Sequence, residues 1–260
     1  MPIVTLTTDY GTTDSYIAEI KGSILTQTNQ VSFIDVSHDI RKFDLYHGAH
    51  VVRNAFHSFP EGTLHLVSVG VFSPDSSYAL SLYKGHHFCG PDNGVMSLIF
   101  EGLRATHNLI TLPLPKEFNS FPAKFFFPIV AHHIAQGGTP EIIASAVPSL
   151  RPVFSPKPVI MNDLIRANIQ YIDEFGNLIT NLDTSEFEKV RAGRSFSIRF
   201  RLPGFRTQTI SEHYNSVDEG DIVALFNQHG FLEIAINSGN ASQLLGVQIN
   251  DLISISFNDR

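Results

Sequence analysis

The stretch VTLTTDYGTTDSYIAEIKG at residues 4–22 decides the fold expected for this chain. It begins as an apolar, β-rich run that ends on the acid Asp9, and a tight polar turn follows. An amphipathic helix comes next, because Tyr16, Ile17 and Ile20 recur at helical spacing. Open α/β sheets bind their ligands outside the carboxyl ends of the strands. The order of strand, acid, turn and helix therefore predicts an α/β domain with a binding site near Asp9.

Two interpretations of the acids in this stretch stay open at the level of sequence. An ionised carboxylate only accepts hydrogen bonds, so Asp9 is suited to bind the two hydroxyls of a ribose. Alternatively, Asp9 and Asp14 only cap the turn and the helix.

The composition is that of a globular, enzyme-sized chain. Its 260 residues suffice for one or two domains, and a hydrophobic fraction of 43% with 17% charged residues is ordinary. The formal net charge of −7 argues against nucleic acid as a partner. No apolar run has the length of a membrane span, no signal peptide is evident after Met1, and the single cysteine, Cys89, excludes an internal disulfide. We therefore expect a cytoplasmic protein without a membrane partner.

The pattern of predicted elements changes near the proline-rich segment PSLRPVFSPKP at 148–158, which is typical of a linker. Before it, strand-like and helical runs alternate, which favours a mostly parallel sheet with flanking helices. After it, short alternating strands with hairpin turns favour a small antiparallel β-barrel or sandwich. We expect an α/β domain at 1–150, a linker at 151–163 and a β domain at 164–260.

The ranges of the expected elements follow from the period of the apolar residues. In the first domain the expected strands are 3–8, 31–36, 64–71, 79–83 and 86–90, and the expected helices are 14–27, 44–57, 94–101 and 125–136. In the second domain the expected strands are 164–173, 195–202, 222–227, 231–236 and 252–257.

Motifs of common cofactor and metal sites are absent from the sequence. There is no G-x-G-x-x-G after a strand, no P-loop, no C-x-x-C and no G-x-S-x-G. The pairs His86–His87 and His132–His133 are poor chelators, because adjacent side chains point to opposite faces of a strand and are splayed on a helix. Packed or solvated imidazoles are the favoured interpretation, and we expect no metal site.

Two further loops carry polar side chains next to strands. In IDEFGNLITN at 172–181, Asp173, Phe175 and Asn177 surround a glycine turn. A ring that stacks, an amide that pairs and an acid that takes a positive charge suit a purine joined to an ammonium group. The alternative is an ordinary hairpin turn. The loop GPDNG at 90–94 is equally suited to cap the helix after it, and there we favour the structural role.

These loops together resemble a known family, the S-adenosylmethionine hydroxide adenosyltransferases, which are relatives of the fluorinase and chlorinase enzymes. The resemblance runs nearly end to end and covers both domains. It rests on six segments in the family order: TLTTDYGTTD (5–14), IDVSHDI (34–40), FPEGTLHLV (59–67), GPDNG (90–94), IDEFGNLITN (172–181) and GFLEIAINSGNAS (230–242). It implies the same two domains, and homotrimers that hold the nucleoside between the first domain of one subunit and the second domain of its neighbour.

The resemblance implies a role for several residues of the first domain, which would form the ribose side of the site. Asp9 would hold the ribose hydroxyls, and Phe43 would line the pocket. The turn from Asp14 to Tyr16 would help to bind the ammonium group of the methionine moiety.

The second domain would form the adenine and methionine side. Phe175 and Tyr214 would sandwich the adenine, with Asn177 at its edge. Asp173 would receive the methionine ammonium. The loop residues near the methionine end or the adenine would be Gln228 and His229.

The family reaction is displacement at C5′ of the adenosyl group, with methionine as the leaving group. Members that use hydroxide have an acid, an arginine and a histidine that activate water. Ungapped alignment puts Gly70, Ser77 and Pro122 at these positions, so all three groups are missing here. Ala123 stands where the halogenases cradle the halide, and the long fluorinase insertion is absent, which argues against fluorination and leaves chloride open.

Two functions from different classes follow. The first is hydrolysis of S-adenosylmethionine to adenosine and methionine, or its chloride-dependent variant, with S-adenosylmethionine as substrate and no separate cofactor. The second is binding of S-adenosylmethionine or adenosine without turnover. Polar groups that replace the missing ones in the enzyme would be Ser73, Asp75, Ser77 or Lys124. Asp75 is equally suited to start a Pro-Asp-Ser turn.

Overall fold

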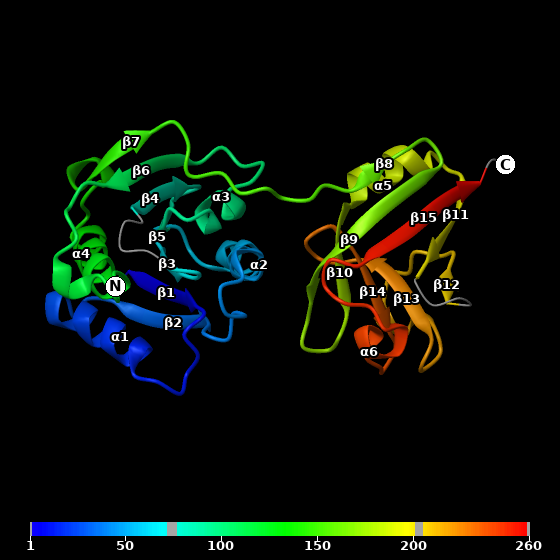
Figure 1. Cartoon of the computed structure of the whole chain (residues 1–260), viewed down its shortest axis with the longest axis horizontal. Coiled ribbons are helices and arrows are strands. Elements are labelled where there is room, and N and C mark those ends of the chain that lie inside the picture. Colours follow the sequence, from blue (N-terminus) through cyan, green and yellow to red (C-terminus); the bar gives the residue numbers. More distant parts are fainter. Residues whose placement is uncertain (1, 72–76, 201–204, 259–260) are drawn as a thin grey trace. The chain divides into compact units, whose positions relative to one another are not determined.

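The computed structural model describes residues 2–71, 77–200 and 205–258. The chain divides into two compact units, Met1–Phe154 and Ser155–Arg260, which we call the α/β unit and the β unit (Figure 1). The segment expected as a linker, 151–163, includes the short strand β8 (Val159–Ile160), which pairs with the first long strand of the β unit.

The α/β unit is built on one seven-stranded sheet with the order β2-β1-β3-β5-β4-β6-β7. Strands β2, β1, β3 and β5 are paired in parallel, and β4, β6 and β7 extend the sheet by antiparallel pairs. The interior strand β1 is buried along almost its whole length, as expected for a strand covered on both faces. The strand bounds are β1 Ile3–Thr8, β2 Ser32–Ser37, β3 Leu64–Ser68, β4 Tyr78–Tyr83, β5 His86–Pro91, β6 Thr106–Ile110 and β7 Ala144–Val147.

Helices cover both faces of this sheet (Figure 1). Helices α1 (Tyr16–Gln27) and α4 (Ala123–Ala135) pack on one face, where Ile20 and Phe127 are fully buried against the strands. Helices α2 (Leu45–Ala55) and α3 (Val95–Ile99) pack on the other face, around Phe56. The short 3-10 turns are η1 Phe56–Ser58, η2 Lys116–Phe118 and η3 Pro140–Ile142.

The side of β1 on which the chain adds its next strand changes after β2: strand β2 is added on one side of β1, and β3 on the other. Strand β1 lies between β2 and β3 and is parallel to both. The helix that follows β1 packs on one face and the helix that follows β2 packs on the other. The carboxyl ends of β1 and β3 are therefore at a topological switch point, where open α/β sheets hold their ligands.

The β unit is an antiparallel, nearly closed, barrel-like sheet. Its strand order is β12-β11-β15-β9-β10-β14-β13, and β8 pairs with β9. The Ser211 N–H donates to the Ala224 carbonyl of β13 over 2.7 Å, which joins the chain after β12 to the far edge of the sheet. The bounds are β9 Leu164–Ile172, β10 Leu178–Asp183, α5 Thr184–Arg191, β11 Ser195–Arg199, β12 Arg206–Thr207, η4 Tyr214–Ser216, β13 Ile222–Phe226, β14 Phe231–Ile236, α6 Ala241–Leu245 and β15 Leu252–Asn258.

The predicted fold class is confirmed: a mainly parallel sheet flanked by helices is followed by an antiparallel, barrel-like sheet. The sequence-based strand at 64–71 was too long, because β3 ends at Ser68 and Val69 and Gly70 enter the loop beyond it. Strands β6 and β7 and helices α5 and α6 were not predicted. In the part of the chain that the structure describes, no helix is long and apolar enough to cross a membrane.

Candidate active site

A pocket of about 300 Å³ opens at the carboxyl edge of the sheet, beside the ends of β1 and β3. It brings together all four residues predicted for the ribose side, Asp9, Asp14, Tyr16 and Phe43. The other lining residues are Tyr10, Lys42, Val71, Ser120, Phe121 and Pro122. Residues from four separate loops therefore meet at the place that the β1–turn–α1 stretch predicted.

The Asp9 carboxylate is held by backbone groups of two distant loops. Its Oδ2 accepts hydrogen bonds from the Phe43 N–H at 2.9 Å and the Gly70 N–H at 3.1 Å. Asp9 is only 5% exposed, and among the described residues no group bonds to its Oδ1. One oxygen is thus fixed and the other is left to accept from a ligand.

The capping interpretation of Asp9 and Asp14 is wrong. The partners of Asp9 lie 34 and 61 residues further along the chain, not in its own turn. The N-cap of α1 is Ser15, which makes no side-chain capping bond. Both acids are instead available to the pocket.

Phe43 and Gly70 both have left-handed backbone conformations where they donate to Asp9. The φ angle is 66° at Phe43 and 65° at Gly70. A positive φ is uncommon for a residue with a Cβ atom, and such conformations gather at functional sites. The Phe43 ring remains 59% exposed at the pocket.

The GPDNG loop holds the backbone at Gly70, which donates to Asp9, in place. The Asn93 side chain donates to the carbonyls of Val69 and Gly70, each over 2.9 Å. Its oxygen accepts from the Val95 N–H at the start of α3 over 3.2 Å. The favoured structural role of this loop is therefore correct, and the loop also fixes the Gly70 peptide that bonds to Asp9.

Three aromatic rings form one wall of the pocket. The ring centroids of Tyr10, Tyr16 and Phe121 lie 5.4–5.6 Å apart in pairs. The Tyr10 hydroxyl lies 2.6 Å from Ser68 Oγ, and burial raises the pKa of Tyr10 to about 12, so it is a neutral group. Tyr10 and Phe121 were not among the predicted site residues, although Tyr10 directly follows Asp9.

The three positions of the missing water-activating groups, and the candidates that would replace these groups, lie at different places in the structure. Pro122, at the position of the family histidine, lines the pocket, and Gly70, at that of the acid, bonds to Asp9. Ser77 is exposed, and its carbonyl accepts from the Asp92 N–H over 2.7 Å. Lys124 lies 2.8 Å from Glu19 Oε2, and its hydrogen bond lowers the pKa of Glu19. Two candidates lie outside the described residues: Ser73 and Asp75.

In the β unit, the Asp173 carboxylate organises the predicted turn between β9 and β10. Oδ1 accepts from the N–H groups of Phe175 at 3.0 Å and Asn177 at 2.8 Å, and Oδ2 accepts from Asn177 Nδ2 at 3.0 Å. Gly176 has a φ of +84°, and a Cβ atom there would lie 2.2 Å from Asn240 Cγ, so the turn requires glycine. Phe175 is left 78% exposed beside it.

A buried acid that was not predicted, Glu233 of β14, joins the other residues of this side. Its Oε1 accepts from the Tyr214 hydroxyl at 2.8 Å, and its Oε2 accepts from Asn227 Nδ2 at 3.2 Å. Burial raises the pKa of Glu233, and the charge of Asp173 adds to this effect. An acid inside the apolar run FLEIAI was the signal in the sequence.

Gln228 and His229 lie in the turn between β13 and β14. Gln228 Nε2 lies 3.2 Å from His229 Nε2, and Asn227 Oδ1 accepts from the His229 N–H at 3.0 Å. Burial lowers the pKa of His229. The Asn227 side chain therefore connects this turn with Glu233 and Tyr214.

Among the side chains that the structure describes, no three of His, Cys, Asp or Glu are disposed to hold a metal ion. The paired histidines have other contacts. His86 Nδ1 lies 3.2 Å from His65 Nε2, and His133 Nε2 lies 2.7 Å from the Thr139 carbonyl.

The fold and the pocket thus define a protein of two units with a candidate small-molecule site at the switch point of an α/β sheet. Comparison with known proteins is consistent with this class and narrows it. Residues 4–144 match the SAM hydroxide adenosyltransferase N-terminal domain, and residues 167–254 match the C-terminal domain of the same family. The chain belongs to the SAM hydroxide adenosyltransferase family.

Relatives with curated names match over nearly the whole chain. The (R)-S-adenosyl-L-methionine hydrolase of Methanocaldococcus jannaschii is 27% identical and covers 99% of this chain and 97% of its own length. The enzyme of the same name from Salinispora tropica is 29% identical, with 98% of each chain covered. A fluorinase from an Actinoplanes species is 25% identical over 91% of each chain. A solved structure of an uncharacterized conserved protein from Thermotoga maritima superposes with a TM-score of 0.86 at 27% identity, over 98% of this chain and 99% of the other.

Proposed function

We propose that this protein hydrolyses S-adenosylmethionine to adenosine and methionine, with the ribose bound at the Asp9 pocket. The observation that carries the proposal is the state of the Asp9 carboxylate. One oxygen is anchored by two backbone N–H groups, and among the described residues the other has no partner inside the pocket. Relatives that match nearly the whole chain and are named (R)-S-adenosyl-L-methionine hydrolase support the same reaction.

In the proposed reaction, a water oxygen forms a bond to C5′ as the bond between C5′ and the sulfonium sulfur breaks. The sulfur keeps the electron pair and leaves as the neutral thioether of methionine, and the water gives up one proton. The reaction needs in-line attack, so the contribution of the protein is to hold C5′ and the water in place. The aromatic rings that line the pocket give it an apolar wall, which helps to keep bulk solvent away from C5′ and the attacking water.

The two units contribute different parts of the proposed site, with residues 1–150 as the ribose side and 164–260 as the adenine and methionine side. Phe175 and Tyr214 stack on the adenine, and Asn177 pairs with its edge. Asp173 takes the ammonium group, helped by the turn from Asp14 to Tyr16. Asp173 Oδ1 already accepts two hydrogen bonds, but Oδ2 accepts only one and keeps a second lone pair, so this role is compatible with the turn.

The base that takes the proton from the attacking water is proposed to be Asp75. The variant Asp75→Asn tests this assignment, because the change keeps the shape of the side chain and removes its basicity. Equal rates for the parent and Asp75→Asn exclude Asp75 as the base. Ser73 and Ser77 are the neighbouring polar candidates, and Lys124 is a weaker one because it is paired with Glu19.

A second candidate function is binding of S-adenosylmethionine or adenosine without turnover. It is favoured by Gly70, Ser77 and Pro122, which stand where the family resemblance implies an acid, an arginine and a histidine. We further propose that no cofactor is needed, and that the functional unit is a cytoplasmic homotrimer in which neighbouring copies complete each site.

The test is to incubate the purified protein with S-adenosylmethionine and to separate the products by chromatography, with and without chloride. The hydrolase proposal predicts adenosine and methionine in equal amounts in both conditions. Binding without product supports the second candidate. A chlorinated nucleoside that forms only with chloride supports the chloride-dependent variant.

A further inference from the structure

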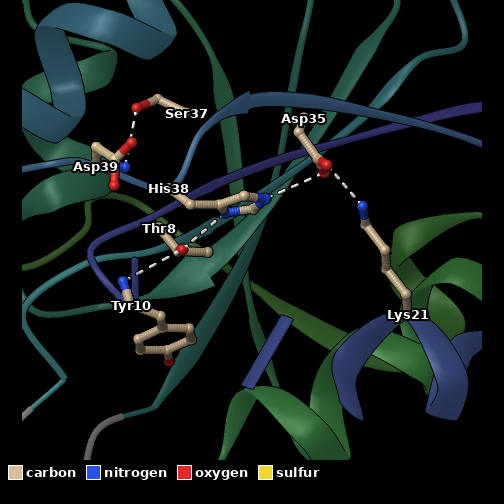
Figure 2. Close-up of polar contacts among 7 residues, drawn as sticks. All are labelled: Thr8, Tyr10, Lys21, Asp35, Ser37, His38 and Asp39. Carbon is tan, nitrogen blue, oxygen red and sulfur yellow. Dashed lines mark hydrogen bonds and ion pairs between the residues drawn. The ribbon is translucent and has the colours of Figure 1, made fainter. Parts of the chain in front are cut away.

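A chain of polar contacts connects Thr8, the residue before Asp9, with Asp35 on the edge strand β2 and with Lys21 of α1 (Figure 2). We call it the His38 network, and it consists of Thr8, Tyr10, Lys21, Asp35 and His38. Of these five residues, only Tyr10 lines the pocket. It therefore needs an explanation other than direct ligand binding.

The imidazole of His38 is the centre of this network. His38 is only 6% exposed, its Nδ1 lies 3.0 Å from Thr8 Oγ1, and its Nε2 lies 3.1 Å from Asp35 Oδ1. Nε2 is buried and faces Asp35 Oδ1 without a well-aligned hydrogen bond. In the tautomer that protonates Nε2 toward this carboxylate, Nδ1 accepts from the Thr8 hydroxyl. Lys21 Nζ donates to the other oxygen of Asp35 over 2.6 Å and so orients that carboxylate.

His38 holds the chain on both sides of Asp9. Before Asp9, the Thr8 hydroxyl that His38 binds also accepts from the Tyr10 N–H over 3.4 Å. After Asp9, the His38 carbonyl accepts from the Gly11 N–H over 2.8 Å. Side chain and backbone of one residue thus fix the segment that presents Asp9.

The loop that starts at His38 also fixes the carboxylate itself. The Phe43 N–H donates to Asp9 Oδ2, and Lys42 Nζ donates to the Asp9 carbonyl. The peptide between Asp9 and Tyr10 is therefore bonded at its carbonyl by Lys42 and at its N–H by Thr8. A shift of His38 would move Asp9 relative to the N–H groups and to any bound ligand.

We propose that His38 is a positioning residue, which sets the direction of the free Asp9 oxygen toward the ribose hydroxyls through Thr8, with Asp35 and Lys21 orienting its imidazole. This inference rests on the proposed function, because it takes a ribose as the ligand of Asp9. It does not require that turnover occurs.

The same strand offers a matched control. His65 is 2% exposed, and its Nδ1 lies 2.8 Å from Thr5 Oγ1, so a second buried histidine binds a second threonine of β1. Thr5 lies four residues before Asp9, and neither Thr5 nor His65 lines the pocket. Loss of a buried histidine–threonine bond can therefore be separated from loss of Asp9 positioning.

The experiment compares adenosine with 2′,3′-dideoxyadenosine by titration calorimetry on the full chain. The readout is the ratio of the two dissociation constants, which isolates the contribution of the ribose hydroxyls. For the parent we expect a ratio of about tenfold or more in favour of adenosine. His38→Ala and Thr8→Val are expected to lower this ratio by about threefold to tenfold, and His65→Ala and Thr5→Val to leave it unchanged.

His38→Asn provides the rescue. Its amide oxygen lies near the position of Nδ1 and still accepts from Thr8, so most of the ratio is expected to return. Thr8→Val removes one hydroxyl at nearly constant volume, so it tests the proposal even if His38→Ala does not fold.

Three results separate the possible failures. A parent that binds both nucleosides equally overturns the ribose assignment and this inference with it. The second result is a parent that favours adenosine as expected, with a ratio of dissociation constants that falls in Asp9→Asn. If His38→Ala and Thr8→Val both keep the parent ratio, only the role of His38 is overturned. An equal loss in His65→Ala and His38→Ala shows a general packing effect and also overturns it.

Discussion

Replacing Asp9 by asparagine separates the two tasks of this side chain. The amide oxygen of Asn can accept from the Phe43 and Gly70 N–H groups as Oδ2 does now. The amide nitrogen then occupies the position of the free oxygen, where it cannot accept from a ribose hydroxyl. Asp9→Asn therefore keeps the support of the loops and removes the proposed ligand contact.

The expected magnitudes differ for the two tasks. Loss of one charge-assisted hydrogen bond costs about 1.5–3 kcal/mol, which weakens adenosine binding about 10- to 150-fold. The free energy of unfolding is expected to fall much less, by about 1 kcal/mol, because both N–H groups keep an acceptor. Asp9→Ala leaves both N–H groups unpaired in a buried place, and it is expected to lower the unfolding free energy by about 1–3 kcal/mol for each.

Calorimetry with adenosine and chemical denaturation of the parent, Asp9→Asn and Asp9→Ala measure both quantities. 2′,3′-Dideoxyadenosine is the control ligand, and its affinity is expected to be nearly the same for the parent and Asp9→Asn. Equal adenosine affinity in the parent and Asp9→Asn would refute the assignment of Asp9 to the ribose.

Three further outcomes are expected. Gly176→Ala combines a left-handed φ with a Cβ atom 2.2 Å from Asn240, whereas Gly220→Ala has a φ of +88° but open space around the new Cβ atom. In urea denaturation we expect Gly220→Ala to lower the free energy of unfolding by about 1–2 kcal/mol and Gly176→Ala to lower it by more. Equal losses in the two variants contradict the close approach at Gly176. Burial raises the pKa of Glu233, so the folded state binds the extra proton and the free energy of unfolding decreases as pH rises from about 4.3 through the folded-state pKa; Glu233→Gln is expected to remove this part of the pH dependence, and unchanged curves refute it. Light scattering is expected to report a trimer at micromolar concentration, and a monomer there contradicts the proposed assembly.

The first strand, turn and helix were readable from the sequence because their signals are local. Apolar spacing and a strand-ending acid located the pocket at Asp9, and alternation of apolar residues located the strands of the barrel. Helix α5 has one buried residue, Phe187, so it has no apolar stripe that would reveal it. Strand β7 has only four residues, and two of them are exposed.

The contacts that shape the site were not readable, because they join residues far apart in the chain. The bond from Phe43 to Asp9 spans 34 residues and the bond from Gly70 spans 61. The left-handed conformation of Phe43 contradicts its local preference and is imposed by the surrounding loops. Glu233 was visible as an acid in an apolar strand, but its partners Tyr214 and Asn227 were not.

The most direct test of the central claim is hydrolysis of S-adenosylmethionine in water enriched in ¹⁸O, with mass spectrometry of the recovered nucleoside. Attack of water at C5′ predicts adenosine that carries the label in its 5′-hydroxyl group, and methionine without label. Unlabelled adenosine, or label on a ribose that has lost its adenine, contradicts displacement at C5′ by water.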